Sequence, residues 1–240
     1  MNLKIKQLVK TYADSTVIDE IDVDLDSVQV LALIGASGSG KSTLLRLISG
    51  LESFDSGTIT VNGHEVDYRT DMAYRKKVGF VFQDHNLFPH LSIYENILLV
   101  LEKVHGRKRE TLGDEVSKLL AQFGLEEHMH KKPHEISGGQ AQRASIVRAL
   151  SIKPELVLLD EPTSSLDPIL TYEVLMAVKM LVFEKIDFII VTHEIGFARE
   201  VADYIIFMEE GKIVEHGTGE ILEKPQTERL QKFLEKVLSF

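Results

Sequence analysis

The chain contains no cysteine and no tryptophan, and its formal net charge at pH 7 is -10. Without cysteine it can form neither disulfide bonds nor a cysteine-ligated metal centre, and it is compatible with a reducing compartment. The negative charge leaves no broad basic face for a phosphate backbone, so we expect no nucleic acid among its partners.

Long hydrophobic runs are also lacking. Apolar stretches such as Val30–Ile34 and Ile97–Leu101 are far shorter than the roughly 18 residues that a membrane-spanning helix needs. Lys4, Lys6 and Lys10 interrupt the N-terminal segment, so we expect no signal peptide there. Any contact with a membrane should therefore be made through a partner protein. What the chain does have is 44% hydrophobic residues over a length of 240, enough for one large core or two small ones.

Apolar runs alternate with helix-like segments along most of the chain, which is typical of a parallel sheet covered by helices. Alternation around Ile5 and over Thr58–Gly63 instead indicates edge strands with one solvated face. Between about residues 87 and 151 the pattern is helical, most clearly over Ile93–Val104 and Leu112–Phe123. The runs typical of buried strands are Val30–Ile34, Val78–Phe82, Leu156–Leu159 and Phe188–Val191.

These patterns predict an α/β fold with a parallel-sheet core, an N-terminal antiparallel β subdomain and an inserted α-helical subdomain. No internal repeat, low-complexity tract or long linker interrupts the chain. A single composite unit is therefore expected rather than separate domains joined by linkers.

A glycine-rich loop directly follows the expected strand Val30–Ile34 and precedes a segment with helical rhythm. A strand, this loop and then a helix form the context in which such a loop binds phosphate; a flexible glycine-serine turn is the alternative for a bare pattern match. Lys41 can reach the β- and γ-phosphates, and the Ser42 hydroxyl can bind Mg²⁺. The candidate phosphate-binding residues are Gly35, Ser37, Gly38, Ser39, Gly40, Lys41, Ser42 and Thr43.

Polar side chains follow the other expected strands. Asp160 and Glu161 come directly after one of them, where Asp160 can hold Mg²⁺ and Glu161 can polarise the attacking water. Gln83 and His193 each follow another strand, although a lone residue of either type is more often structural. Because parallel strands end at one edge of a sheet, we expect these residues to lie at the edge that carries the phosphate loop.

With these motifs in order, the whole chain resembles the nucleotide-binding subunit of an ATP-binding cassette (ABC) transporter, a P-loop NTPase with a RecA-like core. The glycine-rich loop is similar to the Walker A motif. The resemblance implies one ABC ATPase domain over residues 1–240, with a helical subdomain of about residues 87–152 inserted in the nucleotide-binding core. The other matches are Gln83 to the Q-loop, Ile136–Gln140 to the signature, Asp160 and Glu161 to Walker B, Ser164–Asp167 to the D-loop, and His193 to the switch histidine.

The resemblance also implies that ATP and Mg²⁺ are the cofactors and that the chain hydrolyses ATP. Tyr12 resembles the aromatic residue that stacks on adenine, with Val17 beside it. Because the catalytic motifs are intact, a non-catalytic regulatory cassette is disfavoured. The catalytic candidates are Lys41, Gln83, Glu161 and His193, and the candidate Mg²⁺ ligands are Ser42, Gln83 and Asp160.

The signature, Ser137, Gly138, Gly139 and Gln140, opens an expected helix and can form an anion site that the helix dipole strengthens. In the family, this site binds the γ-phosphate of the ATP held by the other subunit. The resemblance therefore implies a head-to-tail homodimer with ATP at the interface, across which Asp167 would communicate. A plain helix cap is the alternative for an isolated match.

Two segments, Phe82–Leu91 and Thr192–Asp203, resemble importers of polar amino acids. In the family, integral membrane permease subunits dock near Gln83–Leu91, which makes Phe88 and Leu91 candidate docking residues; the alternative is that both belong to the core. The resemblance implies an importer ATPase for polar or basic amino acids, peripheral on the cytoplasmic face of the inner membrane and working indirectly with an extracytoplasmic solute-binding protein. The alternative function is a soluble ABC ATPase acting on ribosomes or DNA.

The chain departs from the usual family pattern at Ile136, Ala141 and Ser165. Ile136 is a conservative apolar change, and Ala141 lies beyond the expected phosphate contact. We therefore expect neither to impair catalysis.

Overall fold

The computed structural model describes residues 1–13, 15–69, 71–164 and 166–238, and the chain divides into two compact units. Unit 1 comprises Met1–Arg75 and Lys185–Phe240, and unit 2 comprises Lys76–Glu184. The predicted insert of about residues 87–152 falls within unit 2. No helix among the described residues is both long enough and apolar enough to cross a bilayer.

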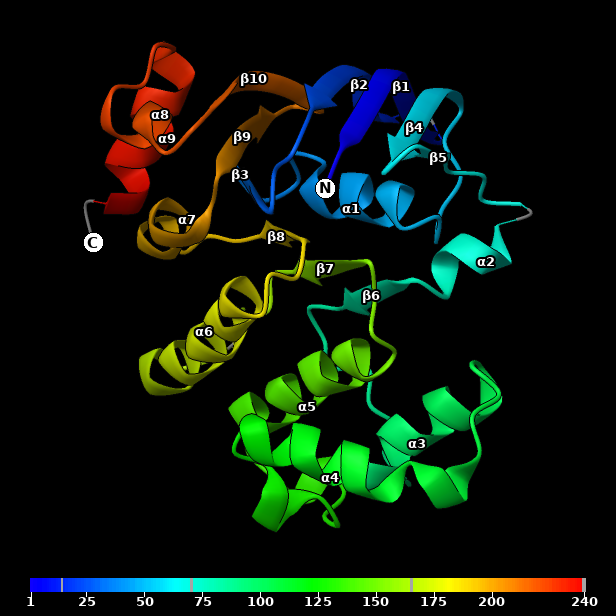
Figure 1. Ribbon diagram of the computed structural model, residues 1–240. Coiled ribbons are helices and arrows are strands. Elements are labelled where there is room, and N and C mark those ends of the chain that lie inside the picture. The colour runs from blue at the N-terminus through cyan, green and yellow to red at the C-terminus, as the bar shows by residue number, and fades with distance from the viewer. Residues whose placement is uncertain (14, 70, 165, 239–240) are drawn as a thin grey trace. The chain divides into compact units, whose positions relative to one another are not determined.

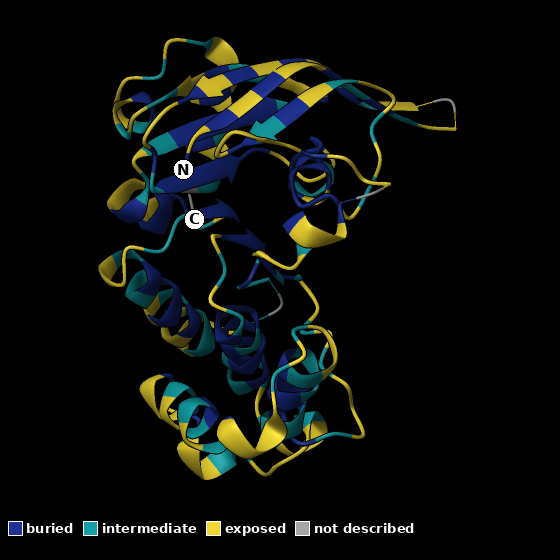
Figure 2. Ribbon diagram, turned by 45° about the vertical axis from the view of Figure 1, so that its right-hand side comes forward, coloured by how far each residue is buried: buried dark blue, intermediate teal, exposed yellow. Residues whose placement is uncertain are grey.

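Unit 1 contains an antiparallel sheet with strand order β2-β1-β4-β5, as the sequence predicted for the N-terminal region. Figure 2 shows buried and exposed residues alternating along it, with one face on the core. The expectation that the strands around Ile5 and Thr58–Gly63 are edge strands was wrong, because β1 and β4 are internal. Alternation of apolar and polar residues indicates that one face of a strand is solvated, and an internal antiparallel strand can also have a solvated face. The strands are β1 (Leu3–Tyr12), β2 (Ser15–Leu25), β4 (Ser56–Val61) and β5 (His64–Glu65).

A second set of strands in unit 1 has the order β10-β9-β3-β8. Strand β3 pairs in parallel with β8 and β9, whereas β10 pairs antiparallel with β9. All residues of β3 and β8 are buried, as expected for parallel strands covered on both faces. The strands are β3 (Val30–Ile34), β8 (Phe188–Val191), β9 (Tyr204–Glu209) and β10 (Lys212–Gly217).

The helices of unit 1 connect these strands or cover them. Helix α1 follows β3 after the glycine-rich loop (Figure 1) and buries its leucines in the core. At the C-terminal end, the Phe233 ring packs 5.1 Å from the ring of Phe207 in β9. The helices are α1 (Lys41–Ile48), α2 (Met72–Arg75), α7 (Ile195–Val201), α8 (Glu220–Glu223) and α9 (Glu228–Leu238).

Unit 2 pairs two parallel strands and carries a cluster of helices in which α3, α4 and α5 pack against one another (Figure 1). The predicted helices over Ile93–Val104 and Leu112–Phe123 are confirmed within one residue at each end. The strand expected over Val78–Phe82 ends at Val81. The elements are β6 (Val78–Val81), α3 (Ile93–Lys103), α4 (Gly113–Gln122), α5 (Gly138–Ser151), β7 (Leu156–Asp160) and α6 (Pro168–Phe183), with 3-10 turns at Arg109–Thr111, Glu126–His128 and Pro133–Glu135.

Candidate active site

Lys41 bends back over the glycine-rich loop between β3 and α1. The side chain is only 3% exposed, and its ammonium donates to the carbonyl oxygens of Gly35 at 2.9 Å and Ala36 at 2.8 Å. A further contact of 3.4 Å joins Lys41 Nζ to the Ser39 hydroxyl. Helix α1 begins with Gly40 as its N-cap residue, which has no side chain to occupy the first-turn amides. The loop thus combines a buried cation with a helix N-terminus, a combination that suits an anion.

Two glycines of this loop allow other strands to approach it closely. A Cβ atom at Gly35 would lie 2.1 Å from the Met208 carbonyl oxygen, and one at Gly40 would lie 2.7 Å from the Val17 carbonyl oxygen. Both glycines also have positive φ angles, 147° and 99°, which other residues rarely adopt. The backbone of Val17 therefore lies against the start of α1.

The remaining loop residues differ in exposure. Ser37 and Gly38 are exposed, Ser39 is buried, and Ser42 and Thr43 are half-buried. A Cβ atom at Gly38 would meet nothing within 4 Å, so open space adjoins the loop at this point. The residues present fit a nucleoside triphosphate with Mg²⁺, because the loop offers backbone amides, a cation and a hydroxyl ligand.

Tyr12, at the end of β1, is 40% exposed, and its hydroxyl donates to the Glu52 carboxylate. Burial, followed by this hydrogen bond, raises the pKa of the Tyr12 phenol to about 12. The aromatic ring predicted to stack on adenine is therefore joined to Glu52, which follows the phosphate-loop helix α1.

His193 leaves the same edge of the unit 1 strands as the glycine-rich loop. Leu33 in β3 pairs with Val191 in β8, and each strand ends within one residue of this pair. Thr192 N donates to the Leu33 carbonyl at 3.3 Å, so Gly35 and His193 emerge together from adjacent strands. His193 is exposed, and unit 1 thus brings together the loop and His193.

In unit 2, Gln83 and Glu161 leave a second strand edge together, since Val81 pairs with Leu159. Asp160 is the last residue of β7 and is 1% exposed, whereas Gln83 is exposed. Glu161 has a φ angle of 44°, a left-handed conformation that costs a non-glycine residue of order 1 kcal/mol. Its carbonyl accepts from Ser164 N at 3.1 Å, which closes the turn after the strand.

The signature residues begin α5 with a reciprocal capping box. Ser137 Oγ accepts from Gln140 N at 3.2 Å, and Gln140 Oε1 accepts from Ser137 N at 3.0 Å. The Gln140 amide nitrogen also lies 3.0 Å from His128 Nε2. Ser137 therefore does cap the helix, and the capped N-terminus keeps the dipole that an anion would use.

The two signature glycines have a packing role that the sequence analysis missed. A Cβ atom at Gly138 would lie 3.1 Å from the Leu166 side chain, and one at Gly139 would lie 3.0 Å from the Leu170 side chain. Any larger residue at either position would meet a leucine side chain closely where α5 meets the start of α6. Nothing in the local pattern of residues 137–140 signals this contact.

Asp167 is the N-cap residue of α6. Its Oδ1 accepts from Ile169 N at 2.9 Å and from Leu170 N at 3.0 Å, with Pro168 in the first turn. The Asp-Pro pair was a signal for this cap, because proline favours the first helical position. Ser165, the third departure from the family pattern, lies outside the described residues.

The segment from Gln83 to Leu91 is held from inside by Asn96 of α3, which is fully buried. Asn96 Oδ1 accepts from Phe88 N at 2.7 Å, and its amide nitrogen donates to the Phe88 carbonyl at 3.2 Å and the Leu91 carbonyl at 3.3 Å. Phe88 itself is 42% exposed, so the core alternative was wrong for this ring. Leu91 is half-buried.

Helix α5 holds the earlier part of the same segment. The Gln142 amide donates to the Phe82 carbonyl at 3.3 Å, and its oxygen lies 2.6 Å from His85 Nδ1. Arg148 donates to the Asn86 carbonyl at 2.7 Å, and burial lowers the pKa of its guanidinium. The helix that begins with the signature therefore also fixes the segment after β6.

Comparison with known proteins identifies the family. The model of the ABC transporter family matches residues 18–164. The L-cystine transport system ATP-binding protein TcyN of Escherichia coli (strain K12) is 44% identical, with 98% of both chains covered. The glutamine transport ATP-binding protein GlnQ of the same strain is also 44% identical, over 98% of this chain and 99% of GlnQ.

A solved structure agrees with this assignment. The dimeric post-hydrolysis state of the ATP-binding cassette MJ0796 bound to ADP and Pi has a TM-score of 0.78 and 29% identity, covering 90% of this chain and 98% of MJ0796. The predicted P-loop NTPase fold is thereby confirmed. The chain belongs to the ABC transporter family and is one of its ATP-hydrolysing subunits.

Proposed function

We propose that the unit 1 residues bind the nucleotide. The Tyr12 ring stacks on the adenine base beside Val17, and the amides of the glycine-rich loop surround the phosphates. Lys41 exchanges its contacts with the Gly35 and Ala36 carbonyls for the β- and γ-phosphates, and His193 donates to the γ-phosphate. The support is that the glycine-rich loop and His193 leave one strand edge of unit 1, and that Val17 lies against the start of α1. The other loop residues with this role are Ser37, Gly38, Ser39, Gly40, Ser42 and Thr43.

In unit 2, Glu161 is the proposed base that accepts a proton from the attacking water, and Gln83 orients that water. The proposed Mg²⁺ ligands are the Ser42 hydroxyl of unit 1 and the Gln83 amide and Asp160 carboxylate of unit 2, since each offers an oxygen ligand that this ion prefers. When bound, Mg²⁺ neutralises charge on the β- and γ-phosphate oxygens. The buried position of Asp160, 1% exposed, suits a fixed ligand.

Two copies of the chain would pack head to tail with ATP between them. Ser137, Gly138, Gly139 and Gln140 of one copy would bind the γ-phosphate held by the other, and Asp167 would lie at the same interface. The capping box at the start of α5 and the dimeric state of the MJ0796 cassette support this arrangement.

The transport system would be an importer for polar or basic amino acids. This proposal is carried by full-length similarity to subunits named for cystine and glutamine transport, which does not favour a ribosomal or DNA-directed role. The chain would lie on the cytoplasmic face of the inner membrane, bound to permease subunits near Gln83–Leu91, with a solute-binding protein outside. Co-purification of a tagged chain with an integral membrane protein tests this, and recovery with ribosomes instead would contradict it.

Phe88→Ser should weaken the complex with the permease, because it removes an exposed ring from a segment that Asn96 holds in place. A single truncated aromatic at an interface centre costs about 2 kcal/mol or more, equivalent to a loss of roughly 30-fold in affinity. Pull-down of the permease measures this, and the ATPase rate of the isolated subunit should not change. Phe183→Ser is the matched control, since Phe183 is an exposed phenylalanine of the same unit, at the end of α6. Equal loss in both variants would argue against docking at Phe88.

Tyr12→Ala should weaken ATP binding by about 5- to 150-fold, because stacking of one base on an aromatic ring is worth about 1–3 kcal/mol. Binding of inorganic tripolyphosphate, which has no base, should not change. Titration calorimetry with both ligands measures the difference. Wild-type affinity for ATP would remove Tyr12 from the nucleotide site.

A further inference from the structure

The Tyr12 ring is exposed and yet fixed in position. An exposed tyrosine at a strand end ordinarily has side-chain freedom that it must lose when a ligand stacks on it. Here the ring is 40% exposed, but its hydroxyl and one of its faces are both engaged by charged groups of unit 1.

The first charged group is Glu52, which accepts the hydrogen bond of the Tyr12 hydroxyl. Glu52 follows α1, and the turn before it is ordered by hydrogen bonds from Gly50 N to Leu47 O at 3.1 Å and from Leu51 N to Arg46 O at 3.1 Å. The position of Glu52 is therefore set by the C-terminal end of the same helix whose N-terminal end closes the glycine-rich loop.

The second group is Lys10, whose ammonium lies 4.8 Å from the centroid of the Tyr12 ring. Lys10 is 8% exposed, and it pairs with the Glu52 carboxylate at 3.5 Å. A cation at this distance over an aromatic face attracts the ring. One ion pair thus holds the tyrosine at its hydroxyl and over one face, while the residue as a whole stays 40% exposed.

A second bridge joins the same two segments. Thr11 N donates to Asp55 Oδ2 at 2.7 Å, and Asp55 N donates to the Val9 carbonyl at 2.9 Å. The end of β1 is therefore tied to the segment after α1 at two positions just before Tyr12. The backbone that carries the ring is fixed as well as the ring itself.

We propose that Glu52 and Lys10 are positioning residues that hold Tyr12 in the orientation in which its uncovered face receives the adenine base, an inference that rests on the proposed nucleotide site. The Tyr12 side chain is then already fixed in the free protein, before ATP binds. Pre-organisation of this kind raises affinity because less side-chain entropy is lost on binding.

Glu52→Ala should weaken ATP binding by roughly 2- to 10-fold, the effect expected from releasing one ordered side chain. Affinity for inorganic tripolyphosphate should stay at the wild-type value, because that ligand does not contact Tyr12. Titration calorimetry with the two ligands on the full chain separates the positioning role from general damage, which would weaken both. Lys10→Met should show the same selectivity for the ligand that carries a base.

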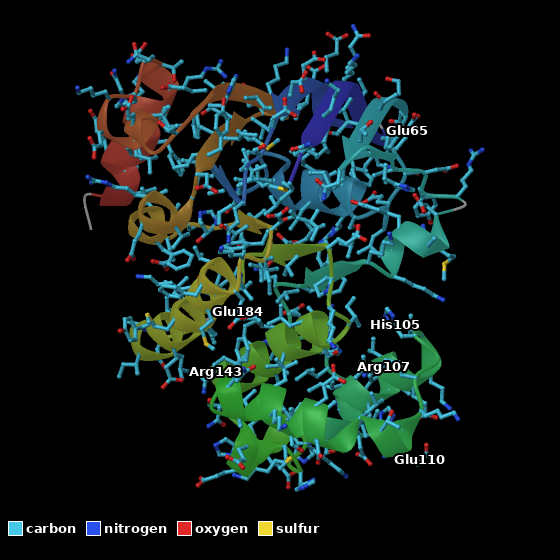
Figure 3. All side chains as sticks on the ribbon, viewed as in Figure 1. Glu65, His105, Arg107, Glu110, Arg143 and Glu184 are labelled. Carbon is cyan, nitrogen blue, oxygen red and sulfur yellow. The ribbon has the colours of Figure 1, made fainter. Side chains whose placement is uncertain are left out.

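Two variants act as controls. Glu52→Gln keeps an oxygen that accepts from the Tyr12 hydroxyl and should recover most of the lost affinity. Glu65→Ala removes an exposed glutamate from β5 of the same unit (Figure 3) and should leave both affinities unchanged. Tyr12→Phe combined with Glu52→Ala should lose no more than Glu52→Ala alone, since Glu52→Ala already removes the hydrogen bond that Tyr12→Phe removes.

The inference is overturned if Glu52→Ala binds ATP like the wild type, if tripolyphosphate binding falls equally, or if the two changes are additive. These outcomes differ from failure of the nucleotide site itself. If Tyr12→Ala retains full ATP affinity, the stacking role of Tyr12 is wrong. If Tyr12→Ala weakens ATP binding and Glu52→Ala does not, only the positioning role is wrong.

Discussion

Replacing Glu161 with glutamine is expected to lower the ATPase rate by about 10²- to 10⁴-fold, the usual contribution of a general base. Glutamine has the same shape as glutamate but cannot accept the proton of the attacking water at neutral pH. ATP affinity should stay within about twofold of the wild-type value, because the variant keeps the nucleotide-binding groups of unit 1. Bound ATP should then persist and the ATP-bound dimer should accumulate.

The backbone at Glu161 supports this assignment. Its φ angle of 44° is costly for a residue with a side chain, and such conformations are concentrated at functional sites. A glycine would adopt this conformation with less strain. Glutamine carries the same backbone strain, which means that the variant should fold as the wild type does.

Glu155→Gln is the matched control for this variant. Glu155 is an exposed residue just before β7, at the opposite end of the strand that leads to Glu161, and it pairs with Lys77 at 2.9 Å. An exposed pair of this kind contributes little to stability, so turnover should not change. Single-turnover phosphate release measures both variants. Wild-type hydrolysis by Glu161→Gln would show that another group is the base.

Features set by local sequence were predictable. Runs such as Val30–Ile34 are apolar throughout because both faces of a parallel strand are covered, and the structure has β3 at these residues. The polar residues after each strand, such as His193, then had to leave at the strand ends. Periodicity also predicted α3 within one residue at each end. A capping box formed by Ser92 and Glu95 fixes the start of this helix locally.

Features set by contacts between distant residues were not predictable. The Tyr12 hydroxyl bonds to Glu52, which is 40 positions away, and no local pattern couples the two. Asn96 reads as an ordinary polar residue of a helix, yet it is buried and holds the backbone of Phe88. The order of internal and edge strands in the antiparallel sheet was misjudged for the same reason, since each strand shows only its own faces.

Unit 2 connects the proposed docking segment to the signature through one helix. Helix α5 begins at the Ser137 cap, and further along it Gln142 and Arg148 hold the backbone from Phe82 to Asn86. These bonds all come from α5, which is one continuous helix. Displacement of the segment around Phe88 by a partner would therefore be transmitted through α5 to its N-terminus. The proposed docking and the proposed γ-phosphate contact would then share a physical link through α5.

The proposed contact of Ser137 with the γ-phosphate can be tested separately from its role as a helix cap. Aspartate caps helices about as well as serine does, and its charge is favourable at a helix N-terminus. Ser137→Asp should therefore leave the stability of unit 2 unchanged and keep ATP binding to the monomer. Across the interface, however, the carboxylate would face a γ-phosphate, and like charges about 4 Å apart repel by about 1–4 kcal/mol at each of the two sites.

That repulsion predicts that ATP-dependent dimerisation weakens by about 30-fold or more. The measurement is light scattering with ATP in the Glu161→Gln background, where the dimer persists. Ser92→Asp is the control, because Ser92 caps α3 through an equivalent capping box, with Ser92 Oγ accepting from Glu95 N at 3.2 Å. It adds the same charge to another helix N-terminus of unit 2 and should leave dimerisation intact. If Ser137→Asp dimerises as its parent does, Ser137 is only a helix cap, because a carboxylate that faced the partner's γ-phosphate would have weakened the dimer.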